Sequence, residues 1–155
     1  ANAQKLLGEA RSTASLISNL VVTARSSQTS MKLTCASKSL TVAYYRASKS
    51  NQLGGTIGVN VATATAVTPT QTQTPISYPS TSTINLSCAA GTGYVTSDGN
   101  LLWTNPTTYP TYDLTFSSSK STVTLQTKVS FSSAGYPRIY IRDSATSSTW
   151  TEVLL

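Results

Sequence analysis

The sequence KLLGEARSTASLISNLVVTAR, residues 5–25, is followed after a short gap by MKLTC, residues 31–35. In the first stretch, apolar side chains recur every three or four residues, which is the spacing of one face of an α-helix. The residues on that face are Leu6, Ala10, Ala14, Ile17, Leu20, Val21 and Ala24. In the second stretch, apolar and polar residues alternate, as they do in a strand with one buried face. The change of period near residue 30 predicts a helix over residues 4–30 and a β-sheet after it.

The remainder of the chain repeats the alternating pattern. Further strands are predicted at residues 40–46, 56–61, 63–67, 84–88, 93–96, 101–103, 112–116, 122–131, 139–142 and 150–154. Asp98-Gly99 lies between two apolar runs and predicts a hairpin, because both positions tolerate positive φ. Residues 68–82 carry three prolines among Thr, Gln and Ser, which predicts a loop that is too polar to pack.

One helix followed by many antiparallel strands indicates an α+β fold, with the N-terminal amphipathic helix packed on antiparallel β-sheet. The length of 155 residues fits a single domain. We place no boundary at residues 68–82, because one helix and two or three strands before them cannot close a core. A helix that begins at the first residue is typical of the second half of a longer one.

The composition favours an exported protein. Only 10% of the residues are charged, against roughly a quarter in an average soluble protein, and Ser and Thr are abundant. One cysteine pair, Cys35 and Cys88, fits a single disulfide in an oxidising compartment. The alternative to an exported protein is a Thr-rich cytosolic domain. The alternative to a disulfide is two separate buried thiols.

Catalytic and metal-binding patterns are missing from the sequence. There is no His, and neither cysteine belongs to a CxxC pair, so a zinc site lacks ligands. The five acids, Glu9, Asp98, Asp113, Asp143 and Glu152, are far apart in the sequence. The glycine-rich run at residues 54–58 lacks the Lys-Ser/Thr of a phosphate loop. We therefore expect a protein that is not an enzyme and that uses no cofactor or metal.

Two segments resemble the FimT/GspH group of type IV minor pilins and pseudopilins. The first is NLVVTARSS, residues 19–27, followed by KLTC, residues 32–35, where the group reads LxxARSEAxxR and then VxLC. The second is VSFSSAGYPRI, residues 129–139, which is similar to the group's f-s-x-x-G-R-x-R segment. Ser27 replaces a Glu of the first motif, and Tyr136-Pro137 separates the Gly from the Arg of the second. The middle of the chain is unmatched.

The resemblance implies a β-rich head, residues 31–155, in one domain with the C-terminal half of a stalk helix, residues 1–30. The expected function is a structural subunit of a type IV pilus or a type II secretion pseudopilus that supports assembly. Its partners would be other pilin subunits and the inner membrane, the latter through an apolar N-terminal helix that we interpret as removed by truncation. The expected location is the bacterial cell-surface pilus or the periplasm.

A DNA-binding minor pilin for natural transformation is the alternative. The net charge is +6, and in FimT-like proteins the C-terminal basic segment resembles a DNA-contacting part, of which Gly135, Arg138 and Arg142 carry over. The candidate DNA contacts are Lys120, Lys128, Arg138, Tyr140 and Arg142, with Tyr136 as a further stacking partner. A second alternative is a secreted adhesive or carbohydrate-binding β domain. It would explain the Tyr, Trp and Thr content, but such modules usually begin with a strand.

Overall fold

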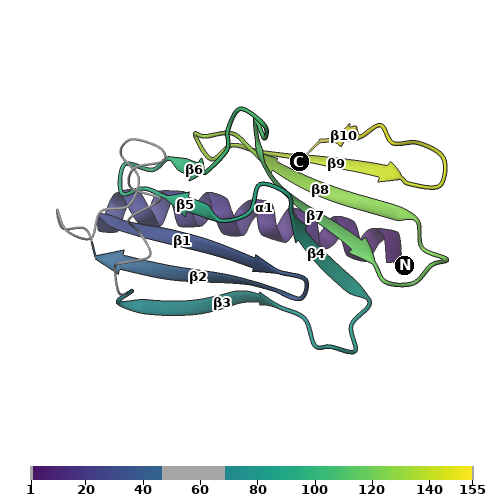
Figure 1. The fold of residues 1–155 in the computed structure, drawn as a ribbon, viewed down its shortest axis with the longest axis horizontal. Coiled ribbons are helices and arrows are strands. Elements are labelled where there is room, and N and C mark those ends of the chain that lie inside the picture. Colours follow the sequence, from purple (N-terminus) through teal and green to yellow (C-terminus); the bar gives the residue numbers. More distant parts are fainter. Residues whose placement is uncertain (1, 47–68, 155) are drawn as a thin grey trace.

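The computed structural model describes residues 2–46 and 69–154 and consists of one long helix packed on two five-stranded antiparallel sheets (Figure 1). The helix α1 spans Asn2–Ser27. The strands are β1 Thr29–Ala36, β2 Ser39–Arg46, β3 Gln71–Ser77, β4 Ile84–Cys88, β5 Gly93–Val95, β6 Leu101–Trp103, β7 Tyr112–Ser118, β8 Leu125–Phe131, β9 Pro137–Asp143 and β10 Thr151–Val153. The first sheet has the order β3-β2-β1-β5-β6, and the second has the order β10-β9-β8-β7-β4.

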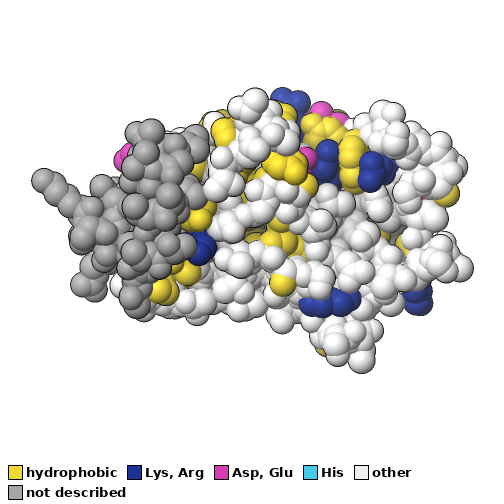
Figure 2. All heavy atoms as spheres, viewed as in Figure 1, with side chains coloured by type: hydrophobic (Ala, Val, Ile, Leu, Met, Phe, Trp, Pro, Cys, Tyr) yellow, Lys and Arg dark blue, Asp and Glu magenta, His cyan; other side chains and the backbone are white. Residues whose placement is uncertain are grey.

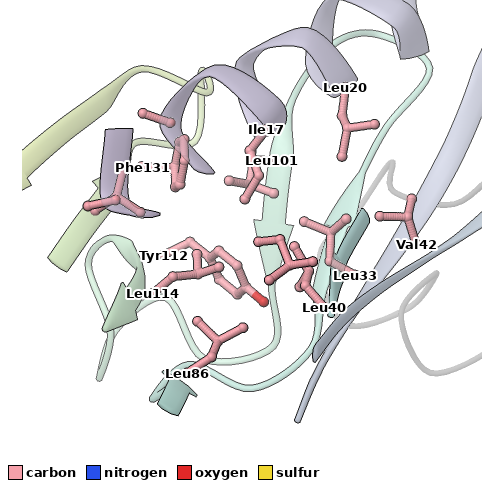
Figure 3. Close-up of a cluster of buried hydrophobic side chains, with 14 of the residues drawn as sticks. Ile17, Leu20, Leu33, Leu40, Val42, Leu86, Leu101, Tyr112, Leu114 and Phe131 are labelled. Atoms are coloured by element: carbon pink, nitrogen blue, oxygen red, sulfur yellow. The ribbon is translucent and has the colours of Figure 1, made fainter. Parts of the chain in front are cut away.

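The apolar face of α1 forms the centre of one core that both sheets share. All seven residues predicted for that face are buried. α1 contacts β1 and β5 of the first sheet and β7, β8 and β9 of the second. Figure 3 shows Ile17 and Leu20 of the helix in the same cluster as Leu33, Tyr112 and Phe131 from the strands. The predicted α+β fold, with the helix packed on antiparallel sheet, is confirmed.

The helix ends three residues earlier than the sequence pattern predicts. Gln28 has a φ of 54°, a left-handed conformation that stops an α-helix. Its side-chain amide donates to the carbonyl of Arg25 at 2.9 Å, which satisfies one of the helix's unpaired terminal acceptors. β1 therefore starts directly afterwards, at Thr29.

The prediction of a loop over residues 68–82 is wrong for its central part, which forms β3. This strand lies at an edge of the first sheet and pairs only with β2, so its exposed Gln and Thr side chains need no apolar face. Pro75 is tolerated because an edge strand does not use every backbone N–H. The register shifts between Leu40 and Val42, where β3 has one residue more than β2, and Ile76 reaches the core.

Other predicted boundaries shift slightly. The strand expected at residues 122–131 begins only at Leu125. In the β5–β6 hairpin, Gly99 has a φ of 84°, whereas Asp98 does not take a positive φ. The strands predicted at residues 56–61 and 63–67 lie outside the described residues.

The disulfide between Cys35 and Cys88 is present and joins the two sheets. Cys35 belongs to β1 and Cys88 to β4, with a Cα–Cα distance of 6.2 Å. It closes a chain separation of 53 residues, which in the chain-entropy account stabilises the fold by about 4 kcal/mol. Nearby, the ammonium of Lys38 donates to the carbonyls of Ser82 and Ile84, each at 2.8 Å.

Gly93 allows the two sheets to approach each other, and its replacement supplies a test of the packing. A Cβ at this position would lie 2.8 Å from Cζ of Tyr112, a side chain that is fully buried. The Tyr112 hydroxyl donates to the carbonyl of Gly91 at 2.8 Å, so the ring cannot easily move. Burial also raises the pKa of Tyr112, which keeps the hydroxyl protonated as a donor.

We expect Gly93→Ala to lower the free energy of unfolding by about 1–3 kcal/mol, the usual cost of overpacking a core. Gly8→Ala is the matched control, because a Cβ at Gly8 in α1 meets nothing within 4 Å. The control should raise stability by up to about 1 kcal/mol through helix propensity. Urea denaturation measures both variants. Equal midpoints for Gly93→Ala and the wild type would contradict the packing described here.

Candidate functional surfaces

The basic residues predicted near the C-terminus lie on the outer face of the second sheet, away from α1. In the β8–β9 ladder, Lys128 is opposite Tyr140, and Arg138 and Arg142 are opposite Ser130 and Gln126. Their neighbours in sequence, such as Val129 and Ile139, point into the core. We call Lys128, Arg138, Tyr140, Arg142 and Trp150 the cationic strip. Figure 2 shows Lys and Arg side chains over the β8–β10 region, with Asp and Glu side chains between them.

Trp150 lies at the centre of the cationic strip. The guanidinium carbon of Arg142 is 4.3 Å from the centroid of a Trp150 ring, and the ammonium of Lys128 is 4.6 Å from it. Lys128 is also 5.0 Å from the ring centroid of Tyr140. Arg142 is held in place by a hydrogen bond from Nε to Oε1 of Gln126 at 2.8 Å and another to the carbonyl of Ser148 at 3.2 Å. Lys128 and Arg142 therefore hold in place the segment that leads into β10, through contacts with Ser148 and Trp150.

Carboxylates neutralise most of the charge of this strip. Lys128 forms an ion pair with Asp113, and Arg138 forms one with Glu152, each at 3.6 Å. Three cations against two carboxylates leave a local charge of +1. At the end of β9, Asp143 accepts hydrogen bonds from Thr124 and from the backbone N–H of Ala145, which lower the pKa of its carboxyl. The strip is thus a compensated cluster of charges.

Two further residues predicted to contact DNA lie outside the strip. Lys120 is exposed in the connection between β7 and β8, where its backbone N–H donates to the Ser118 hydroxyl at 3.1 Å. Tyr136 lies before β9, in the turn that follows β8, and is 74% exposed. The structure therefore brings Lys128, Arg138, Tyr140 and Arg142 together, whereas Lys120 and Tyr136 lie in the connections at opposite ends of β8.

A groove between α1 and the β8–β9 turn is a surface that the sequence reading missed. It has a volume of about 300 Å³, and Val22, Arg25, Tyr136 and Pro137 are among the residues that line it. Val22 is 63% exposed, so two large exposed apolar side chains meet here. The turn fits tightly on the helix: a Cβ on Gly135, which has a φ of 83°, would lie 3.0 Å from Val21. We call this surface the Val22–Tyr136 groove.

Comparison with known proteins shows the fold of the chain. No family model matches it, and no curated protein matches it. Among solved structures, it is similar to the crystal structure of the type IV minor pilin FimU from Pseudomonas aeruginosa, with a TM-score of 0.50. The match has 14% sequence identity and covers 95% of each chain. The chain has a type IV pilin-like fold.

The pilin-like fold agrees with the architecture that the sequence motifs imply. Most of the exposed side chains of α1 are polar, and Val22 is the large apolar exception in the described part of the helix. Across residues 2–46 and 69–154, no helix has both the length and the apolar composition needed to cross a membrane. The same part of the chain contains no group of three or more Cys, Asp or Glu side chains that could hold a metal ion.

Replacing Trp150 tests whether the cationic strip holds β10 in place. This strand has only three residues and lies at a sheet edge, so few ladder hydrogen bonds retain it. Because each of the two cation–π contacts to Trp150 contributes at least about 0.5–1 kcal/mol, Trp150→Ala should speed amide hydrogen exchange in Thr151–Val153 by at least roughly 5-fold. Trp150→Phe keeps a ring and should retain most of the protection. Unchanged exchange in Trp150→Ala would mean that the strip does not retain β10.

Proposed function

We propose that this protein is a structural subunit of a type IV pilus or a related filament, as a minor pilin or pseudopilin that supports assembly. The observation that carries the proposal is the likeness of fold to a type IV minor pilin over 95% of both chains. In this proposal, residues 1–30 are the C-terminal half of a stalk helix and residues 31–155 are the head. The protein would act at the bacterial cell surface or in the periplasm, and would be anchored in the inner membrane before assembly.

The Val22–Tyr136 groove supports an assembly role. Aromatic side chains and Arg are enriched in protein–protein interfaces, and exposed apolar side chains gathered in one patch mark interaction sites. Val22, Tyr136 and Arg25 provide this combination within one groove. The groove also lies on α1, so a subunit that docks there would contact helix and head together.

The acidic residues of the second sheet are engaged in contacts that argue against a catalytic role. Asp113, Asp143 and Glu152 are each engaged with a cation or a hydrogen-bond donor. Glu9 accepts a hydrogen bond from Tyr78, which directly follows β3 of the first sheet, and Asp98 is exposed at a turn. Within the described residues, no two of these carboxylates share a site, which supports a role in binding rather than in acid–base chemistry.

Charged substitutions in the Val22–Tyr136 groove test the proposal. In the source bacterium, the full gene product should be found in filaments sheared from the cell surface. Val22→Asp with Tyr136→Asp should lower its amount in that fraction at least tenfold, because two buried carboxylates would disrupt an apolar interface. Immunoblots of sheared and whole-cell fractions measure this. Tyr109→Asp is the control, since Tyr109 is 36% exposed in the loop before β7.

The filament proposal fails if the wild-type chain is absent from the sheared fraction. If the double variant assembles as well as the wild type does, the groove is not the contact. Val22 and Tyr136 are both exposed, so their replacement leaves the core intact. The double variant should therefore unfold at the wild-type urea midpoint.

A second candidate function is weak, sequence-independent contact with DNA. The observation that favours it is the gathering of Lys128, Arg138 and Arg142 on one sheet face, with Tyr140 between them. Phosphate contacts by such residues depend on salt and do not read the sequence. The ion pairs with Asp113 and Glu152 compete with phosphates, so the strip supports only low affinity.

The DNA candidate predicts a characteristic salt dependence. With two or three phosphate contacts, the log–log slope of affinity against salt should be about −2 to −3, and Arg138→Ala with Arg142→Ala should reduce its size by about 2. Glu152→Gln should tighten binding, because it frees Arg138 from its ion pair. Lys5→Ala with Arg11→Ala removes equal charge from α1 and should leave the slope nearly unchanged. Fluorescence anisotropy with duplex DNA at about 50 mM salt measures these effects, and absence of binding there rejects the candidate.

A further inference from the structure

A cleft of about 260 Å³ lies between α1 and the end of β3. Its walls include the apolar side chains of Leu16, Pro75 and Ile76 together with Tyr78. Glu9 and Thr13, one helical turn apart on α1, supply polar groups, and Ser12 and Ser77 add hydroxyls. None of the residues that line it is basic. The cleft is therefore a mostly apolar slot that has a single negative charge.

Glu9 is the half-buried acid of this slot, and it has no cation partner within the described residues. Its Oε2 accepts a hydrogen bond from the Tyr78 hydroxyl at 2.8 Å. Burial and then the hydrogen bond and charge of Glu9 raise the pKa of Tyr78, so the phenol remains a donor. Asp113 and Glu152 form ion pairs with basic side chains, but neither ion pair in the described part of the chain includes Glu9. One of its two oxygens is thus engaged, and the other has no donor among the described residues.

The hydroxyl of Thr13 is a second polar group in this cleft that lacks a partner among the described residues. This residue is 1% exposed, and its hydroxyl has no hydrogen-bond partner in the part of the chain that the structure describes. Buried hydroxyls without partners are uncommon, because they have lost water without gaining another bond. The unpartnered hydroxyl and the carboxylate without a cation come from adjacent turns of one helix and line one cleft.

These groups match a primary ammonium at the end of an aliphatic stem. An ammonium offers three donors and no acceptor, and its stem can lie along apolar walls while the charge meets the carboxylate. A guanidinium fits less well, since its strongest pairing uses both carboxylate oxygens and Tyr78 already engages one of them. An anionic ligand would be repelled by Glu9.

We propose that the cleft between α1 and β3 binds a lysine side chain of a second copy of this chain, with Glu9 as its counter-ion. The charge balance supports this source, because each copy has eleven Lys and Arg residues but only five acids. Lys5 and Lys120 are exposed and belong to neither ion pair of the described residues, so each copy can donate a lysine. This inference rests on the proposed function, since it names one contact between filament subunits.

The site is tested first with a small probe and without a filament. The isotope-labelled chain is titrated with Nα-acetyl-lysine methylamide, and the amide shifts of Thr13 and Tyr78 are followed by NMR. We expect saturable shifts that weaken at least tenfold in Glu9→Gln, which keeps an acceptor for Tyr78 but removes the charge. The matched norleucine compound has no ammonium and should bind at least tenfold more weakly. Asp98→Asn, which removes equal charge from an exposed turn, should bind the lysine probe as the wild type does.

The source of the lysine is tested by zero-length carbodiimide coupling of a concentrated equal mixture of unlabelled and ¹⁵N-labelled chain. Mass spectrometry should find Glu9 joined to a lysine in mixed-isotope pairs, and Glu9→Gln should abolish that product. No probe binding, or equal binding by Glu9→Gln, overturns the site. Probe binding without mixed-isotope pairs overturns the second copy as the partner. Because neither arm uses filaments, absence of the chain from sheared filaments would reject the filament proposal alone.

Discussion

The structure depends on one helix that provides the common core of two sheets. The inner faces of both sheets are apolar, and each buries that face against the same stripe on α1. A fully buried side chain such as Ile17 contributes about 1.5–3 kcal/mol, so the stripe as a whole outweighs any single contact elsewhere. The buried hydroxyl of Thr127 also donates to the Leu6 carbonyl at 2.8 Å, which fixes the helix along β8. The disulfide adds a covalent link between the sheets on β1 and β4.

This arrangement explains which parts of the fold could be predicted from the sequence. The buried face of α1 and the alternation in β8 and β9 are local patterns, so residues such as Ile17 and Ile139 were placed correctly inside. β3 was missed because its strand character comes from pairing with β2 and not from its own polar sequence. The early helix end depends on the left-handed Gln28, for which the sequence gives little signal.

The candidate surfaces were predictable to a smaller extent. Alternation alone placed Arg138, Tyr140 and Arg142 on one face, as the β8–β9 register has them. Their ion pairs and ring contacts were not predictable, because Asp113, Glu152 and Trp150 reach the strip only through strand pairing. The exposed position of Val22 did leave a signal, since Val22 falls outside the three- and four-residue spacing of the buried face. The partner of Val22, Tyr136, is brought to it by the β8–β9 turn.

The charges of the molecule divide into two kinds of surface, and this division bears on assembly. On the second sheet, acids and cations compensate one another within the same copy, so that face gains little from meeting a charged partner. Beside β3, Glu9 has a hydrogen-bond donor but no cation among the described residues, and the exposed Lys120 belongs to neither ion pair of that part of the chain. In the contact proposed above, the Glu9 carboxylate of one copy pairs with a lysine from the surplus of basic residues in the next copy. Such a contact is head-to-tail whenever donor and acceptor lie on different surfaces, and head-to-tail contacts that do not close generate open helical filaments.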